Sequence, residues 1–107
     1  MKKTIEKDFT LTSFQKKVLK TVLCIPRGEV RSYKWVAERA GSPRSYRAVG
    51  TALNKNPYAP KVPCHRVIAS DGSIGGYSKG IKKKVELLKV EGIIFKTGVL
   101  WRDRSLW

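Results

Sequence analysis

The sequence predicts a mainly α-helical fold with a helix-turn-helix of the winged-helix type and one short β-hairpin. Apolar residues recur at helical spacing in several segments, which is the pattern of amphipathic helices. Two short helical segments are joined at Gly41, as in a helix-turn-helix. A turn signal over Ser70 to Ser73 follows a short apolar run and indicates the hairpin. With 107 residues the chain is expected to form a single domain, 1–107, in which segments 1–11 and 93–107 are peripheral.

The first firm helix is predicted over Thr12 to Ile25. Thr12 and Gln15 have the spacing of a capping box, in which each side chain bonds the backbone N–H of the other residue. Pro26 to Gly28 then ends the helix, because these residues favour turns. Its apolar stripe is formed by Phe14, Val18, Leu19, Val22 and Leu23.

The predicted helix-turn-helix follows directly. A short extended piece, Glu29 to Tyr33, precedes a second helix over Lys34 to Ala40, which Gly41 ends. The third helix is expected over Ser42 to Asn54, with serine as its N-cap and proline at its first helical position. An ordinary helical hairpin would have the same spacing, but the basic residues of the third helix favour a DNA-binding motif.

The second half of the chain is predicted to contain a loop, a strand and one helix. Asn56 to Pro63, with three prolines, is an expected irregular loop, and Arg66 to Ala69 is a predicted buried strand that leads into the hairpin turn. A last helix spans about Gly80 to Glu91, and Gly92 ends it. The residues expected to face inward on this helix are Ile81, Val85 and Leu88.

The charge of the chain is its dominant global property. Lys and Arg total 23 against 8 Asp and Glu, a formal net charge of +15. Such an excess on a small surface favours a polyanionic partner, most simply nucleic acid. The region from Arg39 to Ser70 has no acidic residue, so we expect it to face that partner. A lysine-rich surface that only maintains solubility would have a similar composition, and charge alone does not distinguish DNA from RNA.

Composition and the first residues indicate a cytoplasmic or nucleoid-associated protein. No segment has the length of an apolar membrane span, and the first residues, MKKTIEKDFT, lack the apolar core of a signal peptide. No membrane partner is therefore expected. In a reducing compartment, Cys24 and Cys64 should be free thiols.

The candidate reactive centre is Cys64, within the segment Pro63 to Val67. A thiol beside an imidazole, on a loop that proline restrains, has the ingredients of an activated nucleophile, although a buried structural cysteine is the alternative. Cys24 lies at the apolar end of a helix and is predicted to be structural and buried. His65 is the only histidine, and the cysteines and histidine have no metal-ligand spacing, so neither a metal nor another cofactor is expected.

Glu91 extends the inward face of the last helix, because it follows Leu87 and Leu88 by four and three residues. A carboxylate in the last helical turn is opposed by the helix dipole, so it needs a hydrogen-bond donor unless it is exposed. His65 is a candidate donor, and the pair would orient the imidazole to take the Cys64 proton directly or through water. Simple exposure of Glu91 explains the pattern equally well.

Several short motifs occur in an order that is specific to one family. They are IPRGEVRSY at 25–33, RAVG at 47–50, Asn56-Pro57, PCHRVI at 63–68, GGY at 75–77 and LLKVEG at 87–92. With these motifs the chain resembles the catalytic domain of the O6-alkylguanine-DNA alkyltransferases (methylated-DNA–protein-cysteine methyltransferases) over roughly Phe14 to Gly92. Each piece alone is unspecific, but PCHRV with the others around it is highly specific.

The resemblance implies a reaction and the residues that perform it. Cys64 would irreversibly accept an alkyl group from O6-alkylguanine in double-stranded DNA, a single-turnover DNA-repair reaction without a cofactor. His65 and Glu91 would form the relay that depresses the pKa of the thiol, and Asn56 would tie the helix-turn-helix to the active-site loop. The protein is expected to act as a monomer. The guanine pocket would be lined by Pro63, Val67, Tyr77 and Ser78.

The resemblance also implies how DNA is engaged. Arg47 would fill the gap left when the damaged nucleotide swings out of the duplex. Tyr33 would press on the flanking phosphate, and its hydroxyl is a candidate donor to the departing guanine. Binding from the minor groove suits a recognition helix with small residues, which allow close approach. The residues expected at the DNA are Tyr33, Arg44, Arg47, Ala48, Gly50 and Thr51.

Two departures and two rival functions accompany the resemblance. Many members carry a preceding N-terminal domain, for which this chain has no room, and Lys79 stands where a small residue is usual, so that it would alter pocket access or contact a phosphate. An alkyltransferase-like sensor, which binds alkylated bases without repairing them, lacks the acceptor cysteine, whereas Cys64 is present here. A plain helix-turn-helix regulator that binds DNA by sequence would leave Pro63 to His65 and Glu91 unexplained.

Overall fold

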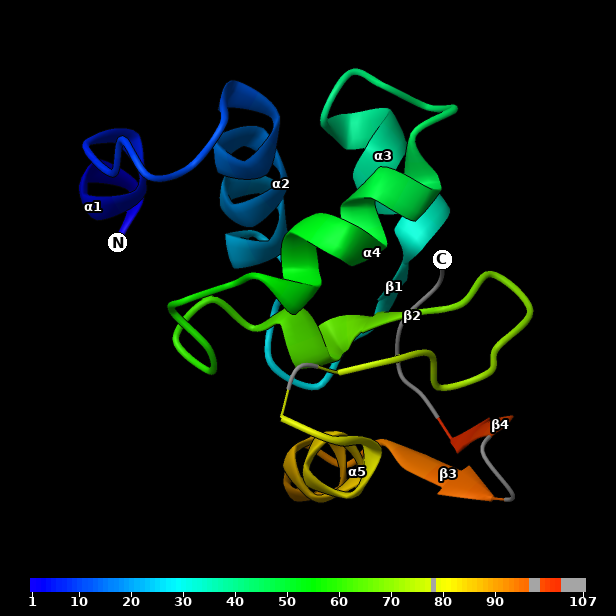
Figure 1. Cartoon of the computed structure of the whole chain (residues 1–107). Helices are drawn as coiled ribbons and strands as arrows, with labels where there is room; N and C mark the ends of the chain where they lie inside the picture. The colour runs from blue at the N-terminus through cyan, green and yellow to red at the C-terminus, as the bar shows by residue number, and fades with distance from the viewer. Residues whose placement is uncertain (78, 97–98, 103–107) are drawn as a thin grey trace.

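The computed structural model describes residues 1–77, 79–96 and 99–102, and most of its regular elements are helices (Figure 1). The mainly α-helical class predicted from the sequence is therefore confirmed. Within these residues, no helix has the length and apolar character needed to cross a membrane. The elements are α1 (Lys2–Glu6), α2 (Ser13–Leu23), β1 (Arg31–Ser32), α3 (Tyr33–Arg39), α4 (Tyr46–Asn54), the 3-10 turn η1 (Cys64–Arg66), β2 (Val67–Ile68), α5 (Ile81–Val90), β3 (Ile94–Lys96) and β4 (Val99–Arg102).

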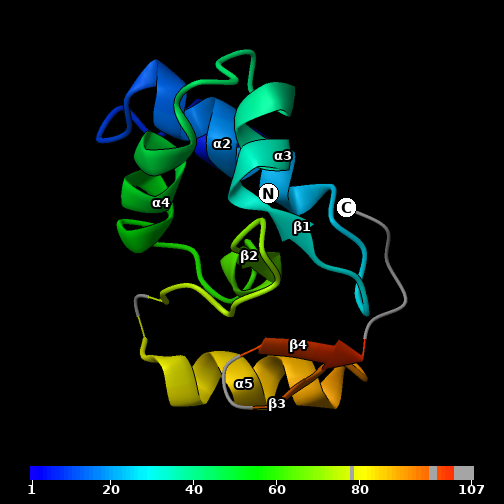
Figure 2. The same ribbon diagram turned by 90° about the vertical axis from the view of Figure 1, so that its right-hand side faces the viewer.

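The elements form two layers that meet at the short strands. Helices α2, α3 and α4 pack against one another, and α5 lies on the other side of β1 and β2, together with β3 and β4 (Figure 2). The larger hydrophobic core fills the helical layer and includes Cys64. Because η1 contacts both α2 and α5, Cys64 lies where the two layers meet. A smaller apolar cluster beside α5 consists of Val30, Ile68, Leu88 and Ile93.

Helix α2 begins at the predicted capping box. The Thr12 hydroxyl accepts the Gln15 backbone N–H at 3.1 Å, and the Gln15 side chain accepts the Thr12 backbone N–H at 2.7 Å. Two N–H groups that lack helical partners are thereby satisfied. The residues that α2 buries are Val18, Leu19 and Val22, as the apolar spacing predicted.

Cys24, by contrast, is exposed, so the prediction that it is buried is wrong. It is the C-cap residue of α2, and its Sγ lies 3.6 Å from the Lys20 carbonyl oxygen. A helical residue two positions after the buried Val22 points to nearly the opposite side of the helix, because each residue turns the helix by about 100°. Its apolar neighbours in sequence therefore do not cover the thiol.

Helices α3 and α4 form the predicted helix-turn-helix, but α4 begins later than expected. Gly41, at φ +82°, and Ser42 complete a Schellman motif at the end of α3. In this motif the Gly41 N–H donates to the Glu38 carbonyl at 3.1 Å, and the Ser42 N–H donates to the Ala37 carbonyl at 2.9 Å. Ser42 thus ends α3, and its carbonyl accepts the Ser45 N–H at 2.8 Å, so that Ser45 and not Ser42 is the N-cap of α4. A turn follows, and Tyr46 is the first residue of α4.

The hairpin predicted after residue 69 is not formed by β2, which pairs in parallel with β1. The turn itself is present, since the Gly72 N–H donates to the Ala69 carbonyl at 3.0 Å. Beyond the turn Gly75 adopts φ +70°, which lies outside the strand region of backbone conformation, so no strand continues there. The antiparallel pair in the described residues is β3 with β4, inside the segment 93–107 that was expected to be peripheral.

The first residues of the chain pack onto the helical layer. Helix α1 contacts α2, and Ile5 is fully buried in the larger core. The Lys16 ammonium donates to the Glu6 carbonyl at 2.9 Å, and Lys20 forms an ion pair with the Glu6 carboxylate. The segment 1–11, expected to be peripheral, thus contributes a residue to the core.

Helix α5 presents a different face to the core from the one predicted. Leu88 is buried as expected and Val85 is half-buried, whereas Ile81 is 44% exposed. The buried residue one turn before Leu88 is Lys84. An ammonium therefore occupies the inward face that the apolar period assigned to hydrophobic residues.

Candidate active site

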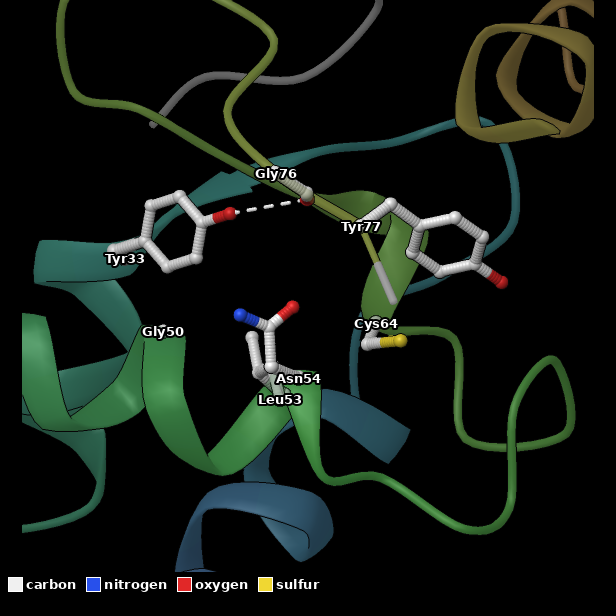
Figure 3. Close-up of a pocket in the computed structure, with 7 residues that line it drawn as sticks. All are labelled: Tyr33, Gly50, Leu53, Asn54, Cys64, Gly76 and Tyr77. Atoms are coloured by element: carbon white, nitrogen blue, oxygen red, sulfur yellow. Dashed lines mark hydrogen bonds between the residues drawn. The ribbon is translucent and has the colours of Figure 1, made fainter. Parts of the chain in front are cut away.

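A cavity of about 230 Å³ lies beside α4, and Cys64 forms part of its wall (Figure 3). In Figure 3, Tyr33 lies on one side of the cavity, Cys64 and Tyr77 lie on the other, and Asn54 points between them. The start of α3, the end of α4 and the loops around β2 therefore converge on one space. The lining residues are Tyr33, Gly50, Leu53, Asn54, Cys64, Gly76 and Tyr77.

Only part of the predicted pocket lines this cavity. Tyr77 does so, but Pro63 and Val67 are buried away from it, and Ser78 lies outside the described residues. Val67 is turned into the larger core because it belongs to β2, whose pairing with β1 fixes its direction.

Leu53 and Asn54 line the cavity although the sequence analysis did not select them. They follow Gly50 by three and four residues, so all three lie on one face of α4. This helical spacing from Gly50, which was predicted to lie at the DNA, is the signal that could have identified them.

Cys64 is positioned by the loop that precedes it. Its backbone N–H donates to the Val62 carbonyl at 2.8 Å, and the same carbonyl accepts the Asn56 side-chain amide at 3.1 Å. Asn56 in turn accepts the Tyr58 N–H at 2.9 Å. The buried Asn56 thus joins the end of α4 to the loop that carries Cys64, which is the contact predicted for it.

Cys64 is a protonated thiol in the resting site. Burial raises its pKa above the ordinary value, and the Asn56 side chain and the Lys84 ammonium oppose this shift only in part. The expectation of a depressed pKa for Cys64 is therefore wrong, because loss of hydration outweighs the neighbouring polar groups. A proton acceptor has to act when the sulfur reacts.

Glu91 is the centre of a buried hydrogen-bond network. His65 Nε2 lies 2.8 Å from Glu91 Oε2, so the predicted contact between these residues is confirmed. Arg66 binds both carboxylate oxygens, with Nε 2.9 Å from Oε1 and Nη2 3.1 Å from Oε2, and the Gly28 N–H donates to Oε1 at 3.2 Å. Burial alone would raise the pKa of Glu91, but the hydrogen bonds from Arg66 and His65 hold it below the ordinary value.

His65 is a neutral imidazole with one unpaired ring nitrogen. Burial lowers its pKa below the ordinary value, although Glu91 acts in the opposite direction. With a carboxylate as its partner, Nε2 carries the proton, which leaves Nδ1 as an acceptor. Nδ1 has no hydrogen-bond partner among the residues that the structure describes. Nδ1 is therefore the ring nitrogen that remains available as a proton acceptor.

Lys84 is a buried charge that the sequence analysis missed. Its Nζ donates to the Val67 carbonyl at 2.7 Å and to the Gly76 carbonyl at 2.9 Å, and it lies 5.8 Å from the centre of the Tyr33 ring. Burial lowers the pKa of Lys84 to about 8. The ammonium favours a thiolate on Cys64. Its position on the inward face of α5 is the signal that could have found it.

Tyr33 and the loop that contains Gly75 and Gly76 lie on the side of the cavity that faces Cys64. Tyr33 is the first residue of α3, and its hydroxyl donates to the Gly76 carbonyl at 3.4 Å. A Cβ on Gly75 would lie 2.8 Å from the Tyr33 hydroxyl oxygen, so this approach requires glycine. Burial raises the pKa of Tyr33, so the phenol remains a hydrogen-bond donor at neutral pH.

Apart from Tyr33, which lies in the cavity wall, the residues predicted to meet DNA lie on or near the outer face of α4. Arg47, Ala48 and Thr51 are exposed on the helix, and Arg44 is exposed in the turn before it. Gly50 lies between this face and the cavity, which it lines. One helix therefore presents an arginine and small residues to solvent and also forms a wall of the cavity.

Lys79 borders the site from the segment before α5. Its ammonium donates to the Ala59 carbonyl at 3.3 Å and so links the loop over 56–63 to the start of α5. In the described parts of the chain, no group of three His, Cys, Asp or Glu side chains is arranged to hold a metal ion.

Known proteins share both the sequence and the fold of this region. The chain matches the family model of the 6-O-methylguanine DNA methyltransferase DNA-binding domain over residues 13–93. It is 55% identical over 80 residues to a methylated-DNA–protein-cysteine methyltransferase of Methanosarcina barkeri, an alignment that covers 75% of this chain and 51% of that protein. The chain thus spans about half the length of the curated relatives it matches.

Two solved structures share the arrangement of helices and strands. The crystal structure of Mycobacterium tuberculosis OGT in complex with DNA matches with a TM-score of 0.75 at 49% identity, over 77% of this chain and 50% of that one. S. pombe Atl1, in complex with damaged DNA containing O6-carboxymethylguanine, matches with a TM-score of 0.73 at 32% identity, over 88% of this chain and 91% of that one. The chain therefore belongs to the 6-O-methylguanine DNA methyltransferase family, whose DNA-binding domain it matches over residues 13–93.

Proposed function

We propose that this chain repairs O6-alkylguanine in double-stranded DNA by transferring the alkyl group to Sγ of Cys64. The observation that carries the proposal is the position of Cys64 in the wall of a cavity, beside a His65–Glu91 pair with a free ring nitrogen. On this proposal, residues 13–93 contain the catalytic site as well as the DNA-binding motif. The Methanosarcina methyltransferase and the DNA complex of the Mycobacterium protein support it.

The transfer is a direct displacement at the alkyl carbon. Sulfur forms a bond to this carbon while the bond from carbon to guanine O6 breaks, and that electron pair leaves with the guanine. The thiol proton of Cys64 passes to Nδ1 of His65, directly or through water, and Glu91 stabilises the imidazolium. The Tyr33 hydroxyl, in the cavity wall, can transfer its hydrogen bond from the Gly76 carbonyl to the departing guanine. The guanine anion then takes up a proton from water and the imidazolium releases the Cys64 proton to water, so that overall one proton moves from the sulfur to the guanine as the alkyl group moves to the sulfur.

A protonated resting thiol suits a protein that reacts once. The thiolate is the form that is oxidised and alkylated indiscriminately, so burial that keeps Cys64 protonated limits side reactions. At the moment of transfer, the Lys84 ammonium and the His65 base reduce the cost of forming the thiolate. The product is a thioether, which has no group that water or a thiol can displace at neutral pH, so each protein molecule is consumed.

Duplex DNA is expected along α4, with the damaged nucleotide rotated out of the duplex into the cavity. The small exposed residues Ala48 and Thr51 allow the helix to approach the minor groove closely, and Arg47 extends from the same face toward the vacated base stack. Arg44 can contact a phosphate. Because Tyr33 lies in the cavity wall, we assign its hydroxyl to the guanine. We expect a monomer to act on DNA in the cytoplasm or the nucleoid.

A damage sensor that binds alkylated bases without repairing them is the second candidate function. The match to S. pombe Atl1, which covers 91% of that chain, favours it. Such sensors lack the acceptor cysteine, whereas Cys64 lies in the cavity here, next in sequence to the residue that can take its proton. The two functions differ in whether the alkyl group moves to the protein.

Intact-protein mass spectrometry distinguishes these functions. After incubation with a duplex that carries one O6-methylguanine, the protein should gain the mass of one methylene group and then stop. Peptide mapping should place the methyl group on Cys64 and not on Cys24, whose exposure makes it an internal control for unspecific alkylation. Cys64→Ser should bind the duplex without the mass gain. Binding by the wild-type protein without a mass gain would identify a sensor, and continued turnover would contradict stoichiometric transfer.

A further inference from the structure

The contacts of Glu91 give a specific part to Arg66. We propose that Arg66 is a positioning residue, which binds the Glu91 carboxylate so that His65 is held as a neutral base with Nδ1 free. The inference rests on the proposed alkyl transfer for its purpose. The electrostatic arrangement itself can be measured without that reaction.

Arg66 is fixed in one orientation by two parts of the fold. Its Nη1 donates to the Ile25 carbonyl at 2.8 Å, just beyond α2, while Nε and Nη2 bind Glu91 at the end of α5. The side chain is 16% exposed. A planar guanidinium bound to both oxygens fixes the plane of a carboxylate, which the point charge of a lysine does not do. The orientation of Glu91, and with it that of the imidazole, is thereby set by residues outside the cavity.

Glu91 uses its full accepting capacity in this arrangement. Oε1 accepts from Arg66 and from the Gly28 backbone N–H, and Oε2 accepts from Arg66 and His65. A carboxylate has about four acceptor positions, so the bond to His65 is one of four rather than an isolated ion pair. Gly28 adopts φ +86°, and a Cβ there would lie 3.4 Å from the Glu91 carbonyl oxygen. The turn over 26–28 therefore belongs to the support of the site.

Burial is the main reason why His65 does not hold a second proton, and the two cations near it act in the same direction. Glu91 favours the imidazolium, whereas Arg66 and Lys84 disfavour it. Because Arg66 shares the Glu91 carboxylate, that carboxylate compensates a proton on His65 only in part while Cys64 remains a thiol. The titratable and charged groups that face His65 are Cys64 and Arg66 of η1, Lys84 and Glu91 of α5 and its C-cap, and Tyr77, whose ring centroid lies 6.4 Å from that of His65.

Removal of the Arg66 charge should convert His65 and Glu91 into an ordinary ion pair. The carboxylate would then have the imidazolium as its nearest cation, so the pKa of His65 would rise. A protonated His65 cannot accept the Cys64 proton. Alkyl transfer by such a variant should therefore fail at the acidic end of the pH range in which the wild-type protein reacts.

His65 is the only histidine of the chain, so its imidazole C–H signals in NMR report its titration directly. We expect Arg66→Met to raise the pKa of His65 by about 1 to 2 pH units. Arg66→Lys, which keeps the charge, should titrate close to the wild type but transfer alkyl groups more slowly. The double variant Arg66→Met/Glu91→Gln, which removes both charges, should return the pKa of His65 to the wild-type value or below it.

Arg27→Met is the matched control. Arg27 is exposed in the turn over 26–28, next to Gly28. Its Nη2 lies 3.4 Å from the Val90 carbonyl oxygen, and it does not bind the Glu91 carboxylate. If Arg27→Met raised the pKa of His65 as much as Arg66→Met does, the overall charge of the protein and not the contact with Glu91 would set that pKa, and the proposal would fail. It would also fail if folded Arg66→Met titrated like the wild type. If Arg66→Met does not fold, the proposal is tested by the double variant and by Arg66→Lys. A purely structural part for Arg66 predicts that the double variant fails to restore the wild-type pKa of His65.

The same samples separate this inference from the proposed function. If the wild-type protein transfers no alkyl group while Arg66→Met shows the shifted titration, the repair function is contradicted and the electrostatic part of Arg66 is supported. If the wild-type protein transfers the alkyl group normally and the pKa of His65 is the same in Arg66→Met as in the wild type, only the inference about Arg66 is overturned.

Discussion

On the proposed mechanism, single buried charges match the state in which Cys64 is a thiolate. Arg66 and Lys84 bring two cations next to His65, and Glu91 is the carboxylate that faces them. The second cation is balanced when Cys64 becomes a thiolate, since Lys84 and the thiolate stabilise each other. Fixed charges that match the reacting state need no reorganisation during the reaction, which is a large part of enzymatic rate acceleration.

Lys84→Met should change the pH dependence of stability in a direction set by burial. The pKa of Lys84 is lowered from 10.5 to about 8 in the folded protein, so the unfolded state binds more protons between these values. The cost of burying the ammonium is therefore complete below pH 8 and disappears as the pH rises to 10.5. The free energy of unfolding of the wild type should rise relative to that of the variant by on the order of 3 kcal/mol over this range.

Urea unfolding at a series of pH values measures this difference. The exposed neighbour Lys83→Met is the matched control. Parallel curves for the wild type and Lys84→Met would mean that the ammonium is hydrated rather than buried.

Arg47→Ala should separate nucleotide flipping from chemistry. A rotated guanine leaves a hole in the base stack, which an arginine can fill while hydrogen bonding to the remaining cytosine. Unstacking costs a few kcal/mol, so the variant should lose about tenfold to a thousandfold of its transfer rate on duplex DNA. Single-turnover rates with free O6-alkylguanine base, which needs no flipping, should stay near the wild-type value. An equal loss on both substrates would assign Arg47 to the fold or the pocket instead.

At the scale of elements, α4 turns one side to the core and the cavity and leaves the other side exposed, where the proposed function places the DNA. Val49, Ala52 and Leu53 pack into the core, while Arg47 and Thr51 remain exposed. The Schellman motif that ends α3 delays the start of α4 and leaves the exposed Arg44 in the connecting turn. The exposed basic residues before, on and after α4, which are Arg44, Arg47 and Lys55, therefore lie within one short stretch of sequence.

Binding through this stretch predicts a steep dependence on salt. Each phosphate contact contributes a slope of about −0.9 to log affinity against log salt concentration, because binding releases counterions. Arg44→Gln and Lys55→Gln should each reduce the slope by up to about 0.9, with little sequence preference. Fluorescence anisotropy with undamaged duplexes measures it. Lys17→Gln, on the exposed side of α2, is the control, and an affinity that ignores salt would place the DNA elsewhere.

At the scale of the whole molecule, the reactive residues lie at the junction of two layers. Cys64 and His65 belong to η1, which contacts α2 in one layer and α5 in the other. Glu91 and Lys84 come from α5, whereas Asn56 follows α4. Separation of the layers would dismantle the site, so the stability of the helical layer bears directly on function.

Ile5→Ala tests how far the first helix supports that layer. Ile5 is fully buried, and truncation of such a side chain leaves a cavity that costs about 2–5 kcal/mol of unfolding free energy. Phe9→Ala is the control, because Phe9 is 95% exposed and should change stability by less than about 0.5 kcal/mol. Thermal and urea unfolding measure both variants. An Ile5→Ala protein as stable as the wild type would mean that α1 is dispensable for the core.

Local signals predicted several elements correctly. The capping box at Thr12 located the start of α2, and Gly41 marked the end of α3, because both depend on hydrogen bonds within a few residues. Local signals failed where two of them competed. Ser42 had the composition of an N-cap, but it belongs to the motif that ends α3, and a turn closed by the Ser45 N–H and the Ser42 carbonyl separates it from α4, whose N-cap is Ser45.

The sequence by itself determined the helical class, the helix-turn-helix and the family resemblance, because periodicity, capping and motif order are properties of the chain. The pairing of His65 with Glu91 was one of two interpretations of the pattern, and the structure confirmed the contact. Only the tertiary structure decided that Lys84 is buried, that Arg66 shares Glu91 with His65, and that Cys64 rests as a protonated thiol. These three outcomes depend on loss of hydration and on contacts between segments far apart in the chain. A residue's own neighbours in sequence do not determine how completely the rest of the fold excludes water from it, and that exclusion sets its charge.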